Sequence, residues 1–96
     1  MSTRTAAGRP GTAVEIILYE RAGCCLCEEM LAVVASLGGE FSLEVKRIDV
    51  GRDPALEARF GDQVPVLFVA GRKAFKYRVT AQRLRERLLR VAASGR

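Results

Sequence analysis

The hydrophobic and polar positions divide the first half of the chain into a strand, a helix and a second strand. Residues 14–19 are nearly all apolar, with Glu15 as the exception, which predicts an inner strand buried on both faces. Apolar residues then recur at helical spacing and predict an amphipathic helix: Leu26, Met30, Val33, Val34 and Leu37. A second strand follows, where Phe41, Leu43 and Val45 alternate with polar residues. The alternation slips at residues 46–47, which predicts a bulge or the end of this strand.

The second half predicts a short helix, two strands and a final helix. Asp53-Pro54 combines an N-cap side chain with a proline at the first helical position, and Gly61 ends this helix. The apolar run 66–69 predicts a strand, and the alternating run 73–77 predicts an outer strand after a tight turn. Thr80 predicts the N-cap of the last helix. The predicted order is β-α-β-α-β-β-α, an α/β fold in which a right-handed crossover makes the first two strands parallel.

Composition indicates one small domain. The chain has 96 residues, of which 49% are hydrophobic and 28% are charged, an ordinary globular balance. We predict a disordered tail over residues 1–12, which are rich in Ser, Thr, Ala, Gly and Pro, and a folded domain over residues 13–93. Residues 1–12 lack the apolar core of a secretory signal, and no apolar run approaches the roughly 20 residues that span a bilayer. We therefore expect a cytoplasmic protein with no membrane partner.

The charge of the chain is unevenly distributed. The net charge is +5, with five basic and seven acidic side chains in residues 1–50, and eleven basic and four acidic ones in residues 51–96. A basic segment can mark a nucleic-acid partner, but these basic residues are not interleaved with aromatic ones. A solvated helix face and an outer hairpin explain the pattern better, so we predict no nucleic-acid partner.

All three cysteines lie within residues 24–27, between the first predicted strand and the first predicted helix. Cys24 and Cys27 form a Cys-x-x-Cys pair at a helix N-terminus, where unpaired N–H groups and the helix dipole favour a thiolate at Cys24. The cysteines are too close together to cross-link a small secreted fold. In a reducing compartment, such a pair beside a βαβ pattern is typical of a redox-active or metal-binding site.

The Cys-x-x-Cys pair before the first helix, the order of elements and Val64-Pro65 before the third strand together resemble the thioredoxin superfamily. Within it, the segment Arg-Ala-Gly-Cys-Cys-Leu-Cys-Glu-Glu, residues 21–29, is similar to the Cys-x-Leu-Cys signature of a small glutaredoxin-like group. The resemblance covers residues 13–92. It implies a thioredoxin-like fold with a four-stranded mixed sheet flanked by helices.

The resemblance implies a thiol–disulfide oxidoreductase in which Cys24 is the nucleophile and Cys27 is the resolving thiol. It also implies that Pro65 is a cis proline beside the pair, and that the free backbone of Val64 binds an extended peptide or glutathione. Arg21 matches a position where glutaredoxins often carry a basic residue, which would stabilise the thiolate or hold a glutathione carboxylate. From the residues alone, Pro65 could also be a trans proline at a strand entry, and Arg21 a surface charge.

The chain departs from the glutaredoxin pattern at positions that bind glutathione. Gln63 stands before Val-Pro, where glutaredoxins commonly have Thr, and residues 77–80 lack the glycine pair and the Asp that recognise the far carboxylate of glutathione. We therefore expect a protein or low-molecular-weight disulfide as substrate, with glutathione as a candidate co-substrate. We expect no resident cofactor, and we expect a monomer.

Two other functions stay open at this point. The three cysteines could hold Cu(I) or Zn(II), or one cysteine from each of two chains could hold an Fe–S cluster. The chain has no histidine and no second cysteine pair to complete a tetrahedral site, so we predict no metal ligand. The third function is a binding module without turnover. Cys25 is either a bystander or a participant, as an alternative disulfide partner or a third metal ligand.

Overall fold

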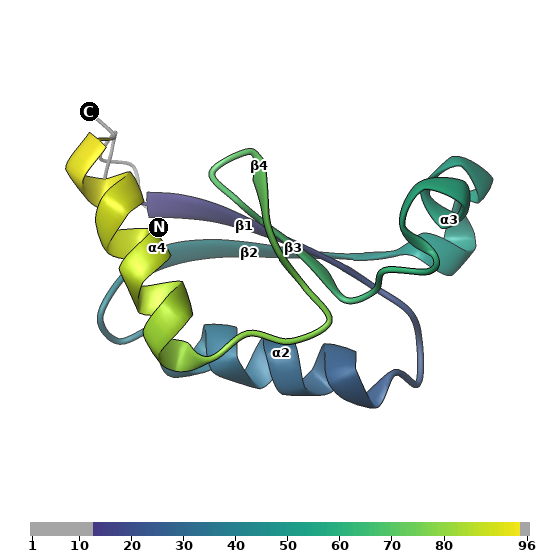
Figure 1. Ribbon diagram of the computed structural model, residues 1–96, viewed down its shortest axis with the longest axis horizontal. Coiled ribbons are helices and arrows are strands. Elements are labelled where there is room, and N and C mark those ends of the chain that lie inside the picture. The colour runs from purple at the N-terminus through teal and green to yellow at the C-terminus, as the bar shows by residue number, and fades with distance from the viewer. Residues whose placement is uncertain (1–12, 95–96) are drawn as a thin grey trace, which may run out of the picture.

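The computed structural model describes residues 13–94, and the predicted disordered tail, residues 1–12, lies outside them. The strands are β1 (Ala13–Glu20), β2 (Ser42–Asp49), β3 (Val66–Val69) and β4 (Arg72–Lys76). The helices are α2 (Cys25–Ser36), α3 (Pro54–Phe60) and α4 (Ala81–Ser94), and a 3-10 turn, η1 (Val50–Arg52), precedes α3. The order β-α-β-α-β-β-α is the predicted one (Figure 1). None of the helices within residues 13–94 is both long and apolar enough to cross a membrane.

The four strands form one mixed sheet in the order β2-β1-β3-β4. β1 pairs in parallel with β2, from Ala13 opposite Ser42 to Glu20 opposite Asp49, as the right-handed crossover requires. β3 is antiparallel to β1, and β4 is antiparallel to β3. β1 is therefore an inner strand, and its last residue leads into the loop that carries the cysteines.

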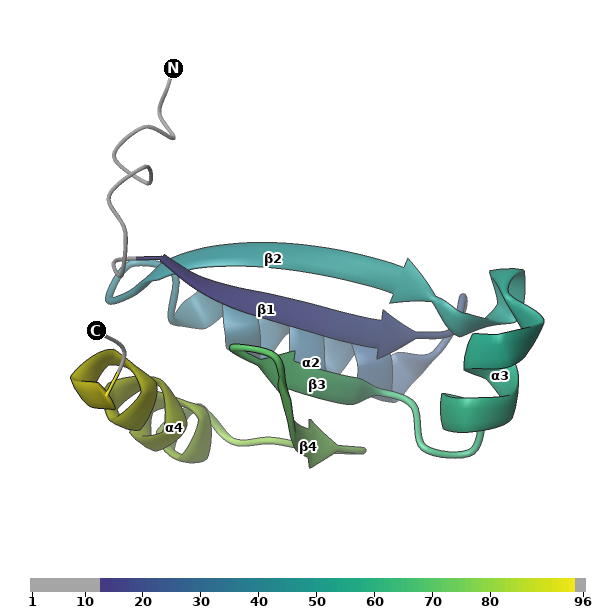
Figure 2. The same ribbon diagram turned by 90° about the horizontal axis from the view of Figure 1, so that it is seen from above.

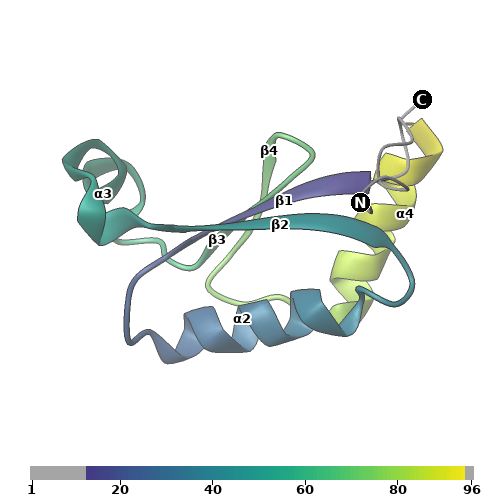
Figure 3. The same ribbon diagram turned by 180° about the vertical axis from the view of Figure 1, so that it is seen from behind.

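The main core lies between one face of the sheet and the helices α2 and α4. Seen from behind, α2 runs beneath β1 and β2, and α3 lies at the opposite end of the molecule from α4 (Figure 3). The buried residues of this core come from β1, α2, β3, α4 and the residue that follows α2: Val14, Ile16, Leu18, Met30, Val34, Leu37, Leu67, Val69, Leu84 and Leu88. Because α2 is held along its apolar stripe, its N-terminus is fixed relative to the end of β1.

The prediction that β1 is buried on both faces is wrong. Glu15 is exposed, and Ile17 and Tyr19 are only partly buried. The reason is that α2 and α4 cover one face, whereas α3 lies only at the end of the strands (Figure 1). A second, smaller core there contains Val50, Phe60 and Val66. Tyr19 closes it by stacking on Phe60, with 4.5 Å between the ring centroids.

The prediction of a bulge or strand end at residues 46–47 is also wrong, because β2 pairs with β1 without a break. The alternation of apolar and polar residues is interrupted because Arg47 lies beside Leu18, on the face of the sheet that the helices cover. Its guanidinium donates hydrogen bonds to both carboxylate oxygens of Glu20, at 2.7 and 3.1 Å, and lies 3.8 Å from Glu28. An ion pair thus replaces the expected apolar contact.

The predicted helix starts are confirmed. The side chain of Asp53 accepts a hydrogen bond from the backbone N–H of Ala55 at 2.9 Å, and a proline follows Asp53 directly. Thr80 Oγ1 accepts one from the backbone N–H of Arg83 at 3.1 Å. Both contacts satisfy N–H groups that a helix leaves without internal partners, so local sequence decides where these helices begin.

Candidate dithiol site

The loop after β1 places Cys24 at the N-cap of α2. Gly23 has a φ of 78°, in the left-handed region that favours glycine, and the backbone N–H of Cys24 donates to the Arg21 carbonyl at 3.2 Å. Cys24 is extended, with φ −88° and ψ 115°, and its Sγ accepts a hydrogen bond from the backbone N–H of Cys27 at 3.1 Å. The sulfur thus takes the place of the usual capping oxygen, where a thiolate gains from this N–H group and from the helix dipole.

Cys27 lies one turn into α2 and is only 1% exposed. Burial, together with a hydrogen bond with the Cys24 side chain, raises the pKa of Cys27 to about 12. The charges of Cys24 and Glu20 act in the same direction, and a backbone hydrogen bond at Arg21 opposes them. Cys27 is therefore a protonated thiol at neutral pH, and it must lose this proton before it can act as a nucleophile.

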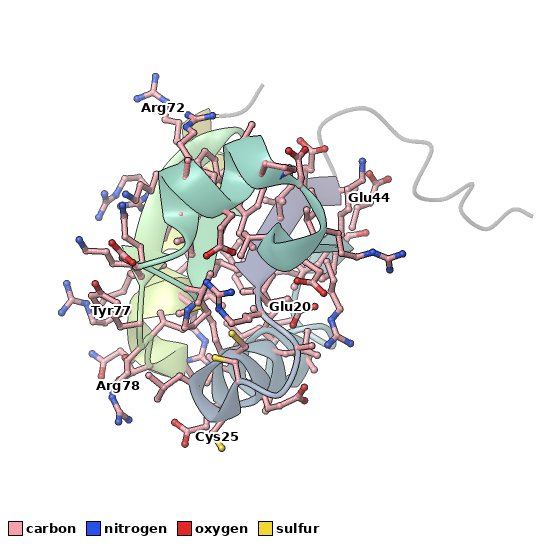
Figure 4. The ribbon with its side chains drawn as sticks, turned by 90° about the vertical axis from the view of Figure 1, so that its right-hand side faces the viewer. Glu20, Cys25, Glu44, Arg72, Tyr77 and Arg78 are labelled. Atoms are coloured by element: carbon pink, nitrogen blue, oxygen red, sulfur yellow. The ribbon has the colours of Figure 1, made fainter. Side chains whose placement is uncertain are left out.

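The three cysteines are free thiols with different exposures. Cys24 is partly buried, Cys25 is exposed and Cys27 is buried. Cys25 points outward from the start of α2 (Figure 4). Among residues 13–94, no group of three or more His, Cys, Asp or Glu side chains is arranged to hold a metal ion. The sulfur of Cys25 therefore does not converge with those of the other two cysteines.

A carboxylate that is nearly buried lies close to the pair. The side chain of Glu20, the last residue of β1, is only 12% exposed, and Arg47 holds both of its oxygens. Its charge acts on Cys27, so the carboxylate lies within electrostatic range of that thiol. Sequence reasoning assigned no role to Glu20. The signal that could have identified it is the position of Glu20 and Arg47 near the ends of two strands that were predicted to be parallel.

Arg21 bridges the cysteine loop and α3. Its Nη2 donates hydrogen bonds to Glu57 Oε2 at 2.8 Å and to the Gly61 carbonyl at 3.0 Å. This contact raises the pKa of Arg21 and lowers the pKa of Glu57. The guanidinium also lies within electrostatic range of Cys24. Its role toward a thiolate or a glutathione carboxylate stays a prediction.

The Val64–Pro65 peptide bond is cis, as the resemblance implies. The pairing of β1 with β3 ends with Tyr19 opposite Val66. In antiparallel pairing, Pro65 and Val64 therefore come next along the segment that leads from β1 to Cys24. The topology thus brings the cis proline toward the cysteine loop, although about forty residues separate them in sequence.

The backbone around the cis proline has one free position and one strained neighbour. Within residues 13–94, no hydrogen bond reaches the backbone of Val64, so its N–H and C=O can pair with an extended ligand. Tyr77 donates its N–H to the Pro65 carbonyl at 2.8 Å and its hydroxyl to the Asp62 carbonyl at 3.1 Å. Its φ is 69°, which is rare for an aromatic residue and which sequence reasoning did not anticipate. The substrate-binding role of Val64 and Pro65 stays a prediction.

Comparison with known proteins identifies the family of this chain. Residues 15–89 match the family model described as glutaredoxin-like domain (DUF836). Uncharacterized proteins of Mycobacterium tuberculosis and Mycobacterium bovis are 33% identical over 81 residues, which is 79% of this chain and 84% of theirs. A structural genomics target protein of X. campestris is 30% identical, with a TM-score of 0.67, over 78% of this chain and 96% of its own.

Chloroplastic thioredoxin z is similar in fold alone. It is 19% identical, with a TM-score of 0.69, over 95% of this chain and 87% of its own. The chain therefore belongs to the family of glutaredoxin-like domains (DUF836), and it has a thioredoxin-like α/β fold and a cysteine pair at the start of α2.

Proposed function

We propose that the chain is a thiol–disulfide oxidoreductase that uses Cys24 and Cys27 as a dithiol/disulfide pair. The observation that supports this most is the hydrogen bond from the Cys27 N–H to Cys24 Sγ at 3.1 Å, with the Cys27 thiol buried beneath it. The first sulfur accepts an N–H hydrogen bond at the helix start, and the second thiol is kept protonated by burial. The two thiols therefore have different chemistry before any substrate binds.

The reaction consists of two exchanges. The Cys24 thiolate attacks one sulfur of a substrate disulfide, so that this S–S bond breaks, the other sulfur leaves as a thiolate and a mixed disulfide forms at Cys24. Cys27 then releases its proton to solvent and attacks Cys24 Sγ, which expels the second substrate sulfur as a thiolate. The dithiol has given two electrons to the substrate and has become a Cys24–Cys27 disulfide. Two further thiols, with glutathione as a candidate, reduce it again by the same two exchanges and become a disulfide themselves.

The residues around the pair have supporting roles in this proposal. The free N–H and C=O of Val64 pair with the backbone of an extended substrate, and Pro65 fixes the direction of that backbone. Arg21, held by Glu57, contributes positive charge near Cys24. Cys25 points into solvent and takes no part in the two exchanges.

The test is a redox titration of the protein in glutathione buffers, read by mass spectrometry after alkylation. We expect a reversible loss of two hydrogens from Cys24 and Cys27, with Cys25 still alkylated. In turnover assays, Cys24→Ser should abolish reduction of a disulfide, and Cys27→Ser should accumulate a trapped mixed disulfide. Cys25→Ser is the matched control and should keep turnover. A pair that never oxidises, or turnover that survives Cys24→Ser, would show that the proposal is wrong.

A further inference from the structure

Basic residues of the second half of the chain gather along one side of the molecule. In Figure 4, Arg72, Tyr77 and Arg78 follow one another along this side, from the end far from Cys25 toward it. β4, residues 77–80 and α4 form this side, which lies away from β2 (Figure 2). The sequence pattern suggested no more than a solvated helix face here, and the proposed reaction assigns these residues no role.

The first of two grooves on this side begins next to the cysteine pair. It lies between α2 and residues 77–80, has a volume of about 570 Å³, and is lined at one end by Leu26, the residue before Cys27. Leu26 and Phe75 are among its apolar lining residues. Its charged lining residues are Lys76, Arg78, Arg83 and Glu29. Three cations thus face one carboxylate.

The second groove lies between the β3–β4 turn and α4, and its volume is about 670 Å³. Val91 supplies apolar surface. Its charged lining residues are all basic: Arg72, Lys73, Arg87 and Arg90. Lys73 Nζ donates to Gln63 Oε1 at 2.6 Å, so its charge is held by a neutral amide. No acidic residue among those described lines this groove.

Arg87 joins the two grooves. Its guanidinium lies 5.5 Å from the centroid of the Phe75 ring, and Phe75 lines the first groove while Arg87 lines the second. Arg83 and Arg87 are four residues apart on α4 and therefore share one face of the helix. The two grooves are thus neighbours, and we call six of their basic lining residues the basic track: Lys76, Arg78, Arg83, Arg87, Arg72 and Arg90.

The positive charge of the basic track is only partly compensated. Within residues 13–94, no carboxylate forms an ion pair with Arg72, Arg83 or Arg87. Arg78 lies 3.5 Å from Glu29, and both of these side chains are largely exposed, so this pair is weak. Cations placed together along a groove repel one another, and an anionic ligand relieves this repulsion.

The chemistry of the surface favours an acidic polypeptide over a nucleic acid. Tracks that bind single strands stack bases on open aromatic rings. Here Arg87 covers Phe75, and Lys76 Nζ lies 5.4 Å from the centroid of the Tyr77 ring. Apolar patches beside the cations, at Leu26 and Val91, match apolar side chains that alternate with carboxylates in an extended peptide.

We propose that the basic track binds an extended acidic segment of the protein that carries the substrate disulfide. This assignment of the partner rests on the proposed function, whereas binding of an acidic segment does not require it. A segment of about ten residues spans roughly 33 Å when extended, and the longest dimension of the molecule is 35 Å. One such segment can therefore reach from the far groove to the cysteine pair.

The binding test uses a cysteine-free peptide of about ten residues in which Glu and Val alternate. We expect the double variant Arg72→Glu/Arg87→Glu to weaken its binding at least about tenfold, and added salt to weaken binding to the wild type. Lys46→Glu/Arg52→Glu is the matched control, because it makes the same change of charge at exposed residues outside both grooves. Arg72→Glu alone, in the exposed hairpin, serves if the double variant fails to fold.

Three outcomes would overturn the proposal. The first is an equal loss of peptide affinity in the control and in the track variants. The second is peptide binding that Arg72→Glu does not change. The third is displacement of the peptide by a single-stranded oligonucleotide whose own binding depends on Arg72 in the same way.

The exchange test compares disulfide peptides with acidic and basic flanks. The wild type and the control should prefer the acidic flank in kcat/KM, and the track variants should lose this preference. If no disulfide is reduced at all, the proposed function fails, and the cysteine-free peptide still decides whether the track binds an acidic segment.

Discussion

The backbone N–H of Cys27 donates a hydrogen bond to Cys24 Sγ at 3.1 Å. The nucleophile of the proposed reaction is therefore also the N-cap of the helix that carries its resolving partner. A charged sulfur strengthens this hydrogen bond, and a sulfur bound in a disulfide carries no charge to strengthen it. The stability of the start of α2 and the redox state of the pair are thus coupled through one contact.

Loss of this cap should destabilise the reduced protein. Cys24→Ala removes the acceptor of the Cys27 N–H, which costs about 0.5–2 kcal/mol at an N-cap. Cys24→Ser abolishes the thiol but keeps a capping oxygen, so its stability should stay close to that of the wild type. Urea unfolding of the two reduced variants measures the difference. Equal stabilities would mean that the sulfur does not act as a cap.

Alkylation should distinguish the three cysteines by position. With a pKa of about 12 and 1% exposure, Cys27 should resist iodoacetamide in the native protein. Its thiolate fraction at about pH 8 is on the order of one in ten thousand. The exposed Cys25 should react readily. Tandem mass spectrometry of the labelled peptide assigns each site, and unfolding in guanidinium should make all three alike. Native Cys27 reacting as fast as Cys25 would contradict the burial.

The contact between Arg21 and Glu57 should depend on pH. Arg21 lowers the pKa of Glu57 below its ordinary value of 4.5, so the ion pair stabilises the fold above that value. This stabilisation should disappear as the pH falls through the lower pKa of the folded state. A double-mutant cycle with Arg21→Gln and Glu57→Gln, measured by urea unfolding at about pH 6 and about pH 3, should show weaker coupling at the lower pH. Coupling of equal size at both pH values would contradict the assignment.

Much of the fold followed from local signals along the chain. Asp53 and Thr80 cap the helices that their positions predict, since a cap is made with residues two or three positions away. The parallel pairing of β1 and β2 followed from the handedness of a strand–helix–strand crossover. The hydrophobic pattern wrongly predicted a bulge or strand end at Arg47. The cause was an ion pair between Arg47 and Glu20, which lies 27 positions away.

Apart from the cis proline that the family resemblance implied, the site was predictable only where its residues are close in sequence. The cysteine spacing and the helix start placed Cys24 and Cys27, but Cys24 was not expected to cap α2 with its own sulfur. Arg21 meets Glu57 across 36 positions, and no local pattern marks such a pair. The left-handed backbone of Tyr77 depends on contacts with residues 62 and 65, so its own segment carried no signal of it.

Glu20 should add to the effect of burial and of the Cys24 hydrogen bond on the pKa of the resolving thiol. Its charge raises the pKa of Cys27, and Arg47, which lies within electrostatic range of Cys27, is held by Glu20. Glu20→Gln removes the negative charge, keeps the shape and leaves an oxygen that accepts from Arg47. The positive charge of Arg47 then acts on Cys27 with less compensation. We expect the pKa of Cys27 to fall, so that alkylation of Cys27 begins at a lower pH than in the wild type.

The matched control for Glu20 is Glu28→Gln. Glu28 lies 3.8 Å from the same guanidinium, but its side chain is 69% exposed and its charge is not among the causes of the raised pKa of Cys27. It should therefore leave the alkylation profile of Cys27 almost unchanged. A profile that moves to higher pH in Glu20→Gln, or equally in both variants, would contradict the prediction. The rate at which Cys27 resolves the mixed disulfide at Cys24 is a second readout. This rate should rise in Glu20→Gln if the charge of Glu20 only suppresses ionisation of Cys27. It should fall if the carboxylate also accepts the proton of that thiol.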